Sequence, residues 1–207
     1  MKYSAPEQTA ITQADQKQPE KTPSDFWLTL RTNVRLQNQA PPIKPVSRDQ
    51  HLPLSFNQER LWFLEQLQPD TSVHNLLHCL HLKGVLDVAA LEQSLIKIAN
   101  RHEILRTTFL IINGLPVQVV SPKIELKLPL VDLSELPPEQ QEQQAQKLAI
   151  EDAEQPFDLT KAPLWRFKLL RLGEQDHILV RTIHHIIFDG WSHSVFMREL
   201  GIIYHAL

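Results

Sequence analysis

The sequence predicts an α+β domain, with helices on one side of a largely mixed sheet. Three features of the 207-residue chain carry this prediction. Apolar, β-branched runs have the pattern of strands, and Asn113-Gly114 separates two of them as a hairpin turn does. Other segments place apolar residues three and four positions apart, which is the spacing of one buried helical face. The strands and helices do not alternate strictly, as a parallel βαβ sheet requires.

Residues 1–50 differ in composition from the rest of the chain. They hold six of the fifteen prolines and seven glutamines, with little apolar periodicity. Such a composition is typical of disordered segments, so we expect a mostly disordered leader. Within it, residues 25–36 (DFWLTLRTNVRL) have one apolar helical face and predict a short helix. That helix either lies on its own domain or docks onto a partner.

Strands of the predicted domain, residues 51–207, are marked by apolar alternation or by β-branched runs. We expect strands at 52–54, 73–83, 105–112, 115–120, 125–131, 164–172 and 177–187. A turn at Gly173-Glu174 makes the last two strands an antiparallel pair.

Four helices are expected from one-sided apolar spacing and from end signals. The first covers 57–67 and stops before Pro69, and the second runs from an Asp87 cap to about residue 102. The third covers 139–155 behind Pro137-Pro138. The fourth follows Ser192, a good N-cap residue.

Composition and charge exclude several classes of protein. The net charge of -3, without a basic cluster, argues against a nucleic-acid surface. The single cysteine, Cys79, rules out an internal disulfide. The polar first residues lack the apolar core of a signal peptide, and no apolar run reaches membrane-spanning length. We therefore expect a soluble, cytoplasmic protein.

The segment 183–192, IHHIIFDGWS, is the candidate functional site. It lies where a buried strand breaks at Asp189-Gly190 into a turn and a helix. Because side chains alternate along a strand, His184 and His185 are expected on opposite faces, so only one of them faces a given cleft. An imidazole takes up protons near neutral pH and so suits acyl transfer. A purely structural histidine pair is the alternative at this point.

A metal site is less favoured than either an acyl-transfer site or a structural histidine pair. His184, His185 and Asp189 are zinc candidates, but opposed strand faces and the lack of a CxxC or HExxH motif argue against them. In the strand 73–83 the same alternation separates the histidines at 74 and 78 from Cys79 and the histidine at 81. We therefore expect no bound metal.

Three arginines are candidates for supporting roles. Arg60 is a charge in an otherwise apolar helical turn, and Asp189 is one candidate partner, with simple surface exposure as the alternative. Arg101 and Arg106 lie at a corner between a helix and a strand. Hydrogen bonds and ion pairs that hold this corner are the simplest role for both.

Three motifs resemble those of one family. HHIIFDGWS is similar to the HHxxxDG core motif of the condensation domains of nonribosomal peptide synthetases, which are relatives of chloramphenicol acetyltransferase and other HxxxD acyltransferases. Residues 55–64, SFNQERLWFL, resemble the first motif, SxAQxRLWxL, with Asn57 in place of alanine. Residues 101–109, RHEILRTTF, match RHExLRTxF throughout. The motifs occur in the family's order, and the resemblance runs from about Leu52 to the last residue.

The resemblance implies a fold and an incomplete cleft. Condensation domains consist of two chloramphenicol acetyltransferase-like lobes arranged as a V, with the histidine motif at the floor of a tunnel between them. This chain resembles the N-terminal lobe only. A face that packs on the second lobe would be exposed here, which predicts a sizeable apolar patch and a tendency to associate.

The resemblance also implies an activity and roles for the site residues. The activity is amide-bond formation between an acyl or peptidyl thioester and an aminoacyl amine, both held on the phosphopantetheine of partner carrier proteins. His185 is implied as the catalytic residue, acting by positioning the amine and by late proton transfer. Asp189 would hold the turn, the Gly190 amide would line an oxyanion site, and His184 would support the fold. No cofactor is expected on this chain itself.

Two other functions stay open. The polypeptide is either a truncated, catalytically silent condensation fragment or a module that docks carrier proteins. Alternatively it is a stand-alone CoA-dependent acyltransferase with an HxxxD site, which would need a trimer to complete its clefts. The first two motifs fit this last alternative poorly.

Overall fold

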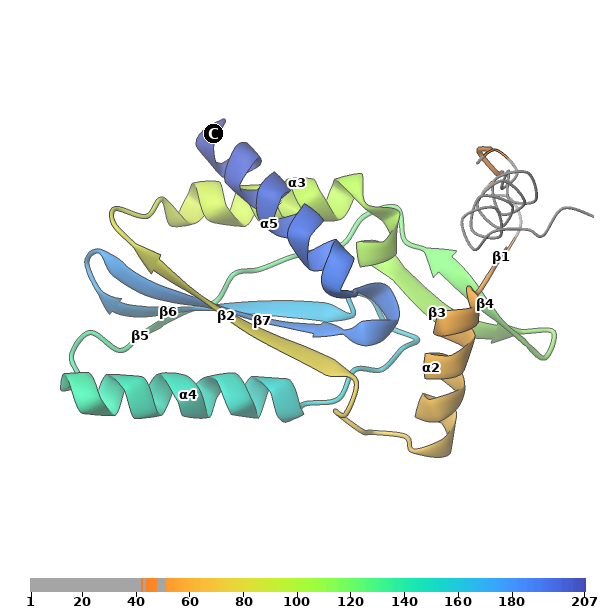
Figure 1. The fold of residues 1–207 in the computed structure, drawn as a ribbon, viewed down its shortest axis with the longest axis horizontal. Helices are drawn as coiled ribbons and strands as arrows, with labels where there is room; N and C mark the ends of the chain where they lie inside the picture. The colour runs from red at the N-terminus through yellow and green to blue at the C-terminus, as the bar shows by residue number, and fades with distance from the viewer. Residues whose placement is uncertain (1–41, 43, 48–50) are drawn as a thin grey trace, which may run out of the picture. The chain divides into compact units, whose positions relative to one another are not determined.

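A four-stranded sheet forms the centre of the folded unit Ser47–Leu207 (Figure 1). The computed structural model describes residues 42, 44–47 and 51–207. The expected helix at 25–36 and most of the expected leader lie outside them. The strand order is β2 (Asn75–Lys83), β7 (Asp176–His184), β6 (Trp165–Gly173) and β5 (Leu130–Asp132). All neighbours are antiparallel except β5 and β6, which are parallel, so the sheet is mixed as predicted.

A second, three-stranded sheet has the order β1 (Leu52–Pro53), β4 (Leu115–Val120) and β3 (Thr107–Ile112), with antiparallel neighbours. β3 and β4 form the hairpin that the sequence predicts. At its tip Asn113 has φ 53° and Gly114 has φ 79°. Asparagine and glycine are the residues that adopt such positive φ values most readily, so this pair sets the tight turn.

Helices cover both faces of the four-stranded sheet (Figure 1). α4 (Pro138–Glu154) lies on one face, whereas α3 (Val88–Arg101) and α5 (Gly190–His205) lie on the other. The expectation of helices on one side only is therefore wrong. The physical reason is visible in β6 and β7, which carry apolar residues at successive positions, so that both faces need covering. Such successive pairs are Leu169-Leu170 and Leu179-Val180, all buried.

Local signals set the starts of the helices. α2 (Phe56–Leu67) begins with a capping box, in which the Ser55 hydroxyl accepts a hydrogen bond from the Gln58 amide at 3.3 Å. The Gln58 side chain in turn accepts one from the Ser55 amide at 2.9 Å. Asp87 caps α3 through the Ala90 amide at 2.9 Å, as predicted. α5 begins behind Asp189 and not behind Ser192.

Three strands are notably shorter than predicted. The strand expected at 177–187 stops at His184 and is followed by a tight 3-10 turn, η2 (His185–Ile187). The strand expected at 105–112 loses its first residues to another such turn, η1 (Glu103–Arg106). The strand expected at 125–131 is reduced to β5, because the register with β6 covers only residues 130–132. Among the described residues, no helix is both long and apolar enough to cross a membrane.

Candidate active site

His185 stands at the exposed turn between β7 and α5. Its side chain is exposed, whereas the preceding His184 is buried. The Nδ1 atom of His185 lies 2.7 Å from the carbonyl oxygen of Phe188. A carbonyl oxygen only accepts hydrogen bonds, so Nδ1 carries the proton of the neutral ring. The Nε2 atom is thereby left with a free lone pair, as a proton acceptor needs.

A cavity of about 300 Å³ adjoins His185. Its walls come from the cap and first turns of α2, from η1, and from the turn that carries the histidine. The polar residues of α2 on this wall are Asn57, Gln58 and Arg60. The first and third motifs, far apart in sequence, therefore line one cavity. Its apolar wall includes Ile104, which lies within the second motif.

Asp189 holds the turn beneath this cavity. One carboxylate oxygen accepts hydrogen bonds from the Ser192 amide at 2.8 Å and from the Ser192 hydroxyl at 2.6 Å. These bonds lower the pKa of Asp189, so the carboxylate stays ionised near neutral pH and caps α5. Gly190, expected to offer its amide to an oxyanion, begins α5 but is not among the residues that line this cavity. Its role stays a prediction.

Arg60 is exposed at the mouth of the same cavity and forms no ion pair with Asp189. Asp189 instead directs one carboxylate oxygen to Ser192 at the start of α5. Of the two readings of Arg60 from sequence, surface exposure is the one that the structure adopts. From the cavity wall its guanidinium remains available to an anionic group of a ligand.

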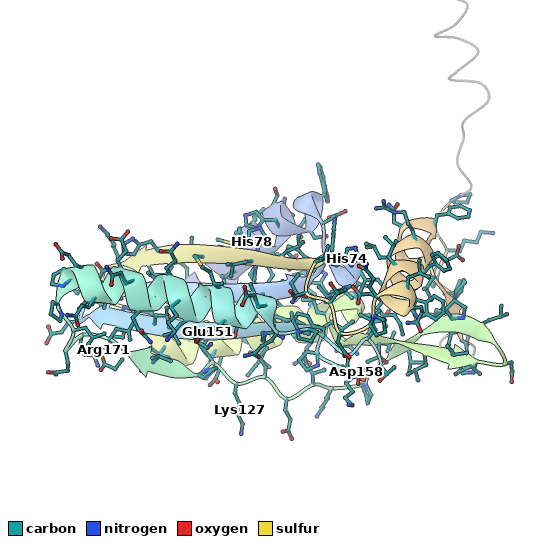
Figure 2. The ribbon with its side chains drawn as sticks, turned by 90° about the horizontal axis from the view of Figure 1, so that it is seen from below. His74, His78, Lys127, Glu151, Asp158 and Arg171 are labelled. Atoms are coloured by element: carbon teal, nitrogen blue, oxygen red, sulfur yellow. The ribbon has the colours of Figure 1, made fainter. Side chains whose placement is uncertain are left out.

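His184 belongs to a triad with Glu65 and His74 that the sequence analysis did not predict; His184 and Glu65 are buried and His74 is half-buried. Its Nε2 atom lies 3.1 Å from Glu65 Oε1, and the same oxygen is 2.6 Å from His74 Nδ1. His74 lies where β2 begins, beside α2 (Figure 2). The His74 carbonyl also accepts a hydrogen bond from the His185 amide at 2.8 Å. The triad thus fixes both segments on which the backbone of His185 depends.

One signal for Glu65 was present in the sequence. It lies four residues after Leu61, on the same buried face of α2. A charged group on such a face needs buried partners, because an unpaired charge is costly to bury. No local pattern, however, names histidines that come from another strand.

The triad also has the composition of a metal site, since one ligand atom of each residue lies within 4.8 Å of the others. Its hydrogen bonds favour a different assignment. The Ile186 amide donates to His184 Nδ1 at 3.1 Å, so Nε2 must carry the proton of the neutral ring. A metal on Nε2 would move that proton to Nδ1, against another N–H group. We therefore assign a hydrogen-bonded triad.

The second motif holds a corner of the fold. Arg106 donates to the carbonyl oxygens of Ala99 at 3.2 Å, of Asn100 at 3.3 Å, and of Ser121. Arg101 Nε lies 3.6 Å from Glu199 on α5. These contacts tie the end of α3 to β4 and α5. Neither arginine lines the cavity at His185.

A second polar cluster lies under α4, on the opposite sheet face. The buried Asp152 carboxylate contacts Arg166 Nε at 3.1 Å and Lys168 Nζ at 3.2 Å. It also accepts a hydrogen bond from the Thr182 hydroxyl at 2.6 Å. Burial alone raises the pKa of Asp152, but the Thr182 bond and the two cations outweigh it, so the pKa is lowered. The sequence reading missed this cluster as well.

Acidification is expected to destabilise the fold from about pH 6.5 downward. Burial lowers the pKa of His184 below 6.5, although its bond to Glu65 raises it, and burial also lowers the pKa of His78 and His177. Above the unfolded pKa both states are neutral. Below the unfolded pKa only the unfolded chain takes up these protons. The free energy of unfolding therefore decreases as the pH falls.

Urea midpoints at about pH 7.5 and about pH 5.5 measure this loss. Replacing His184 by asparagine, which keeps a donor and an acceptor but does not titrate, is expected to reduce the pH dependence. An unchanged dependence in this variant would show that His184 does not contribute to it.

The comparisons with known proteins agree with this geometry. The chain matches the family described as "Condensation domain" over residues 48–207. It is 49% identical over 178 residues to one of the linear gramicidin synthase polypeptides of Brevibacillus parabrevis, covering 86% of this chain and 2% of that protein. Phosphinothricin tripeptide synthetase PhsC of Streptomyces viridochromogenes is 40% identical, covering 76% of this chain and 14% of that protein.

Solved structures give the same result. The first condensation domain of the CDA synthetase has a TM-score of 0.71 at 26% identity, covering 76% of this chain and 40% of that one. A chain in the complex of the X-domain and OxyB from teicoplanin biosynthesis has a TM-score of 0.70 at 36% identity. The match covers 79% of this chain and 34% of that one. The chain thus spans a small share of its curated relatives and less than half of each of these solved chains. The chain belongs to the condensation-domain family and carries the N-terminal lobe of such a domain.

Proposed function

We propose that the polypeptide carrying this sequence joins a carrier-bound acyl or peptidyl thioester to a carrier-bound aminoacyl amine. The observation that carries the proposal is the exposed imidazole of His185 beside a cavity, with Nδ1 held by Phe188 and Nε2 free. The family, together with relatives named as peptide synthases and synthetases, supports this reaction.

The reaction balances without a redox partner. The amine nitrogen attacks the thioester carbon, a C–N bond forms, and the C–S bond of the donor breaks. One proton leaves the nitrogen and ends on the departing thiolate. Because an α-amine has a pKa of about 7.7–8.0, neutral amine is already present near pH 7, so strong base catalysis is not required. His185 Nε2 accepts a hydrogen bond from the amine, orients it, and then transfers the proton.

Both substrates reach the cavity on phosphopantetheine arms of partner carrier proteins. Exposed apolar side chains, such as Phe56 with 91% and Trp191 with 81% of its surface exposed, supply contact area for neighbouring domains of a synthetase. Phe56 is the first residue of α2, and Trp191 is the second residue of α5. Both therefore flank the segments that line the cavity.

The test is peptide formation between loaded carriers. A donor and an acceptor carrier are loaded with each proteinogenic amino acid in turn and mixed with the longest polypeptide that carries this sequence. Intact-protein mass spectrometry then follows the acceptor carrier. Transfer of the donor acyl group onto the acceptor supports the proposal.

Other outcomes separate the rival functions. Transfer from acetyl-CoA to a free amine, without carriers, would identify a CoA-dependent acyltransferase instead. Carrier binding without transfer for any pair would identify a docking module. Transfer by the longer polypeptide but not by residues 1–207 alone would mean that this chain supplies His185 to a cleft that the rest of the polypeptide completes.

A further inference from the structure

A buried arginine occupies the other side of the histidine turn. Arg181 lies on β7, and only 3% of its surface is exposed. Its guanidinium carbon is 4.9 Å from the centre of the Phe188 ring and 4.7 Å from that of Phe196. Across the sheet Arg181 is the register partner of His78 on β2. The side chain therefore lies between the sheet and α5.

No carboxylate among the described residues pairs with Arg181. One terminal nitrogen donates to His193 Nδ1 at 2.7 Å, and the buried Nε has no hydrogen-bond partner. Burial lowers the pKa of Arg181 to about 10, so the group is still charged near neutral pH. Burying an unpaired charge is costly, and the two aromatic rings offset only part of that cost.

The opposite face of the same sheet shows what a paired arrangement looks like. There Arg166 and Lys168 share the carboxylate of Asp152, which Thr182 also contacts. Thr182 is the residue next to Arg181 and points to the other face. One face of β7 thus holds a compensated charge cluster, whereas the other holds a cation with an unused donor.

A cavity of about 410 Å³ adjoins the Arg181 side chain. Arg181, His78 and His193 form its polar part, and the two imidazole rings stack at 4.8 Å between their centres. The remaining wall is mostly apolar, with Leu179, Met197 and Leu200 among its residues. The volume is within the range of small-molecule sites, which combine apolar walls with a few polar groups.

We propose that this cavity binds a carboxylate carried on an apolar body, with Arg181 pairing to the carboxylate and the apolar wall covering the rest. A carboxylate matches the planar donor geometry of a guanidinium and balances one positive charge. A phosphate dianion carries a second negative charge, which the single charge of Arg181 does not balance. The shared chemistry fits either a free carboxylic acid or an acyl group that ends in a carboxylate while tethered to a carrier.

One residue, Phe188, connects the two sites. The ring of Phe188 covers Arg181, while its carbonyl oxygen holds Nδ1 of His185, and Phe188 also lines the cavity at that histidine. A ligand on Arg181 would therefore be separated from the turn that positions the catalytic ring by the Arg181 side chain and the Phe188 ring. The binding proposal itself does not depend on the proposed acyl transfer.

Calorimetric titration with hexanoate, and with its neutral isostere hexanamide, tests the site directly. Hexanoate is expected to bind at least about tenfold more tightly than hexanamide, and Arg181→Met is expected to remove this preference. Arg198→Met, an exposed arginine on α5, is the matched control and should bind hexanoate as the unchanged protein does. Arg181→Met is also expected to unfold at no lower urea concentration, because it removes an unpaired buried charge.

Several results would overturn the proposal. Equal affinity for hexanoate and hexanamide, no binding of either, or unchanged binding in Arg181→Met would each do so. Binding by residues 1–207 but not by the longest polypeptide that carries them would show that an internal carboxylate pairs with Arg181 instead.

A further experiment distinguishes a free carboxylic acid from a carrier-tethered acyl group. This experiment rests on the proposed acyl transfer. Donor carriers loaded with adipyl and with hexanoyl groups are compared. Faster transfer of adipyl, lost in Arg181→Met, assigns the site to a tethered acyl group. Hexanoate binding without any adipyl advantage assigns it to a free acid, and a complete lack of transfer tests only the proposed function.

Discussion

Replacing His185 by alanine is expected to lower the rate of amide formation by about 100-fold to 10,000-fold, the usual contribution of a positioned acid–base group. The variant removes the only part of the turn that presents a free imidazole nitrogen to the cavity. Because the ring is exposed, its loss costs little folding energy. The rate is measured under single-turnover conditions with loaded carriers, so that carrier release does not mask the chemical step.

Two variants control for this prediction. In His185→Asn the side-chain amide still donates to the Phe188 carbonyl but offers no basic nitrogen, so its rate should fall as in the alanine variant. His205→Ala removes another exposed histidine, at the end of α5, and should leave the rate unchanged. If His185→Ala retained the full rate while folded, amine orientation would have to come from other groups and the proposed role of this ring would be wrong.

Replacing Asp152 by alanine is expected to reduce the free energy of unfolding by about 3–5 kcal/mol. The change leaves the cations of Arg166 and Lys168 and the hydroxyl of Thr182 without their shared acceptor. The side chains of Arg166 and Lys168 are only 24% and 21% exposed, and a poorly solvated charge without a partner costs more than the lost attraction alone. Urea unfolding measures the difference, provided that the slope of the transition is unchanged.

A neighbour on the same helix provides the matched control. Glu151 is exposed and lies 3.8 Å from Lys147 one turn earlier, so Glu151→Ala should cost less than about 1 kcal/mol (Figure 2). A second replacement, Lys168→Met in the Asp152→Ala background, should recover part of the lost free energy of unfolding because it removes one cation that has no partner in that variant. Equal stability of Asp152→Ala and Glu151→Ala would show that the contacts of Asp152 with Arg166, Lys168 and Thr182 do not stabilise the fold.

Local patterns were sufficient to predict most of the elements of the domain. Capping residues such as Ser55 and Asp87 mark the helix starts, and Asn113-Gly114 marks a hairpin because so few residues adopt its positive φ values. The end of β7 was not predictable in this way. The apolar run continues to residue 187, but the His184 side chain binds the Ile186 amide and turns the backbone after the strand.

Pairs of distant residues account for what the sequence reading missed. The candidate His185 was found because its motif is continuous, and its exposure follows from the turn that interrupts the strand. The pairings of Glu65, His74 and Asp152 were not predicted because the partners come from other elements, and no spacing rule connects them. Arg181 was hidden inside a run that reads as apolar strand. Each is a buried polar group whose role depends on packing of the whole domain.

The position of β2 at the end of the four-stranded sheet has a practical consequence. No described residue pairs with its outer side, so its free amide and carbonyl groups can continue the sheet into a second molecule. The strand, NLLHCLHLK, carries a lysine only at its last position, which gives little electrostatic protection against such growth. Concentrated samples of this chain are therefore prone to aggregate by strand addition, and dilute handling favours the monomer.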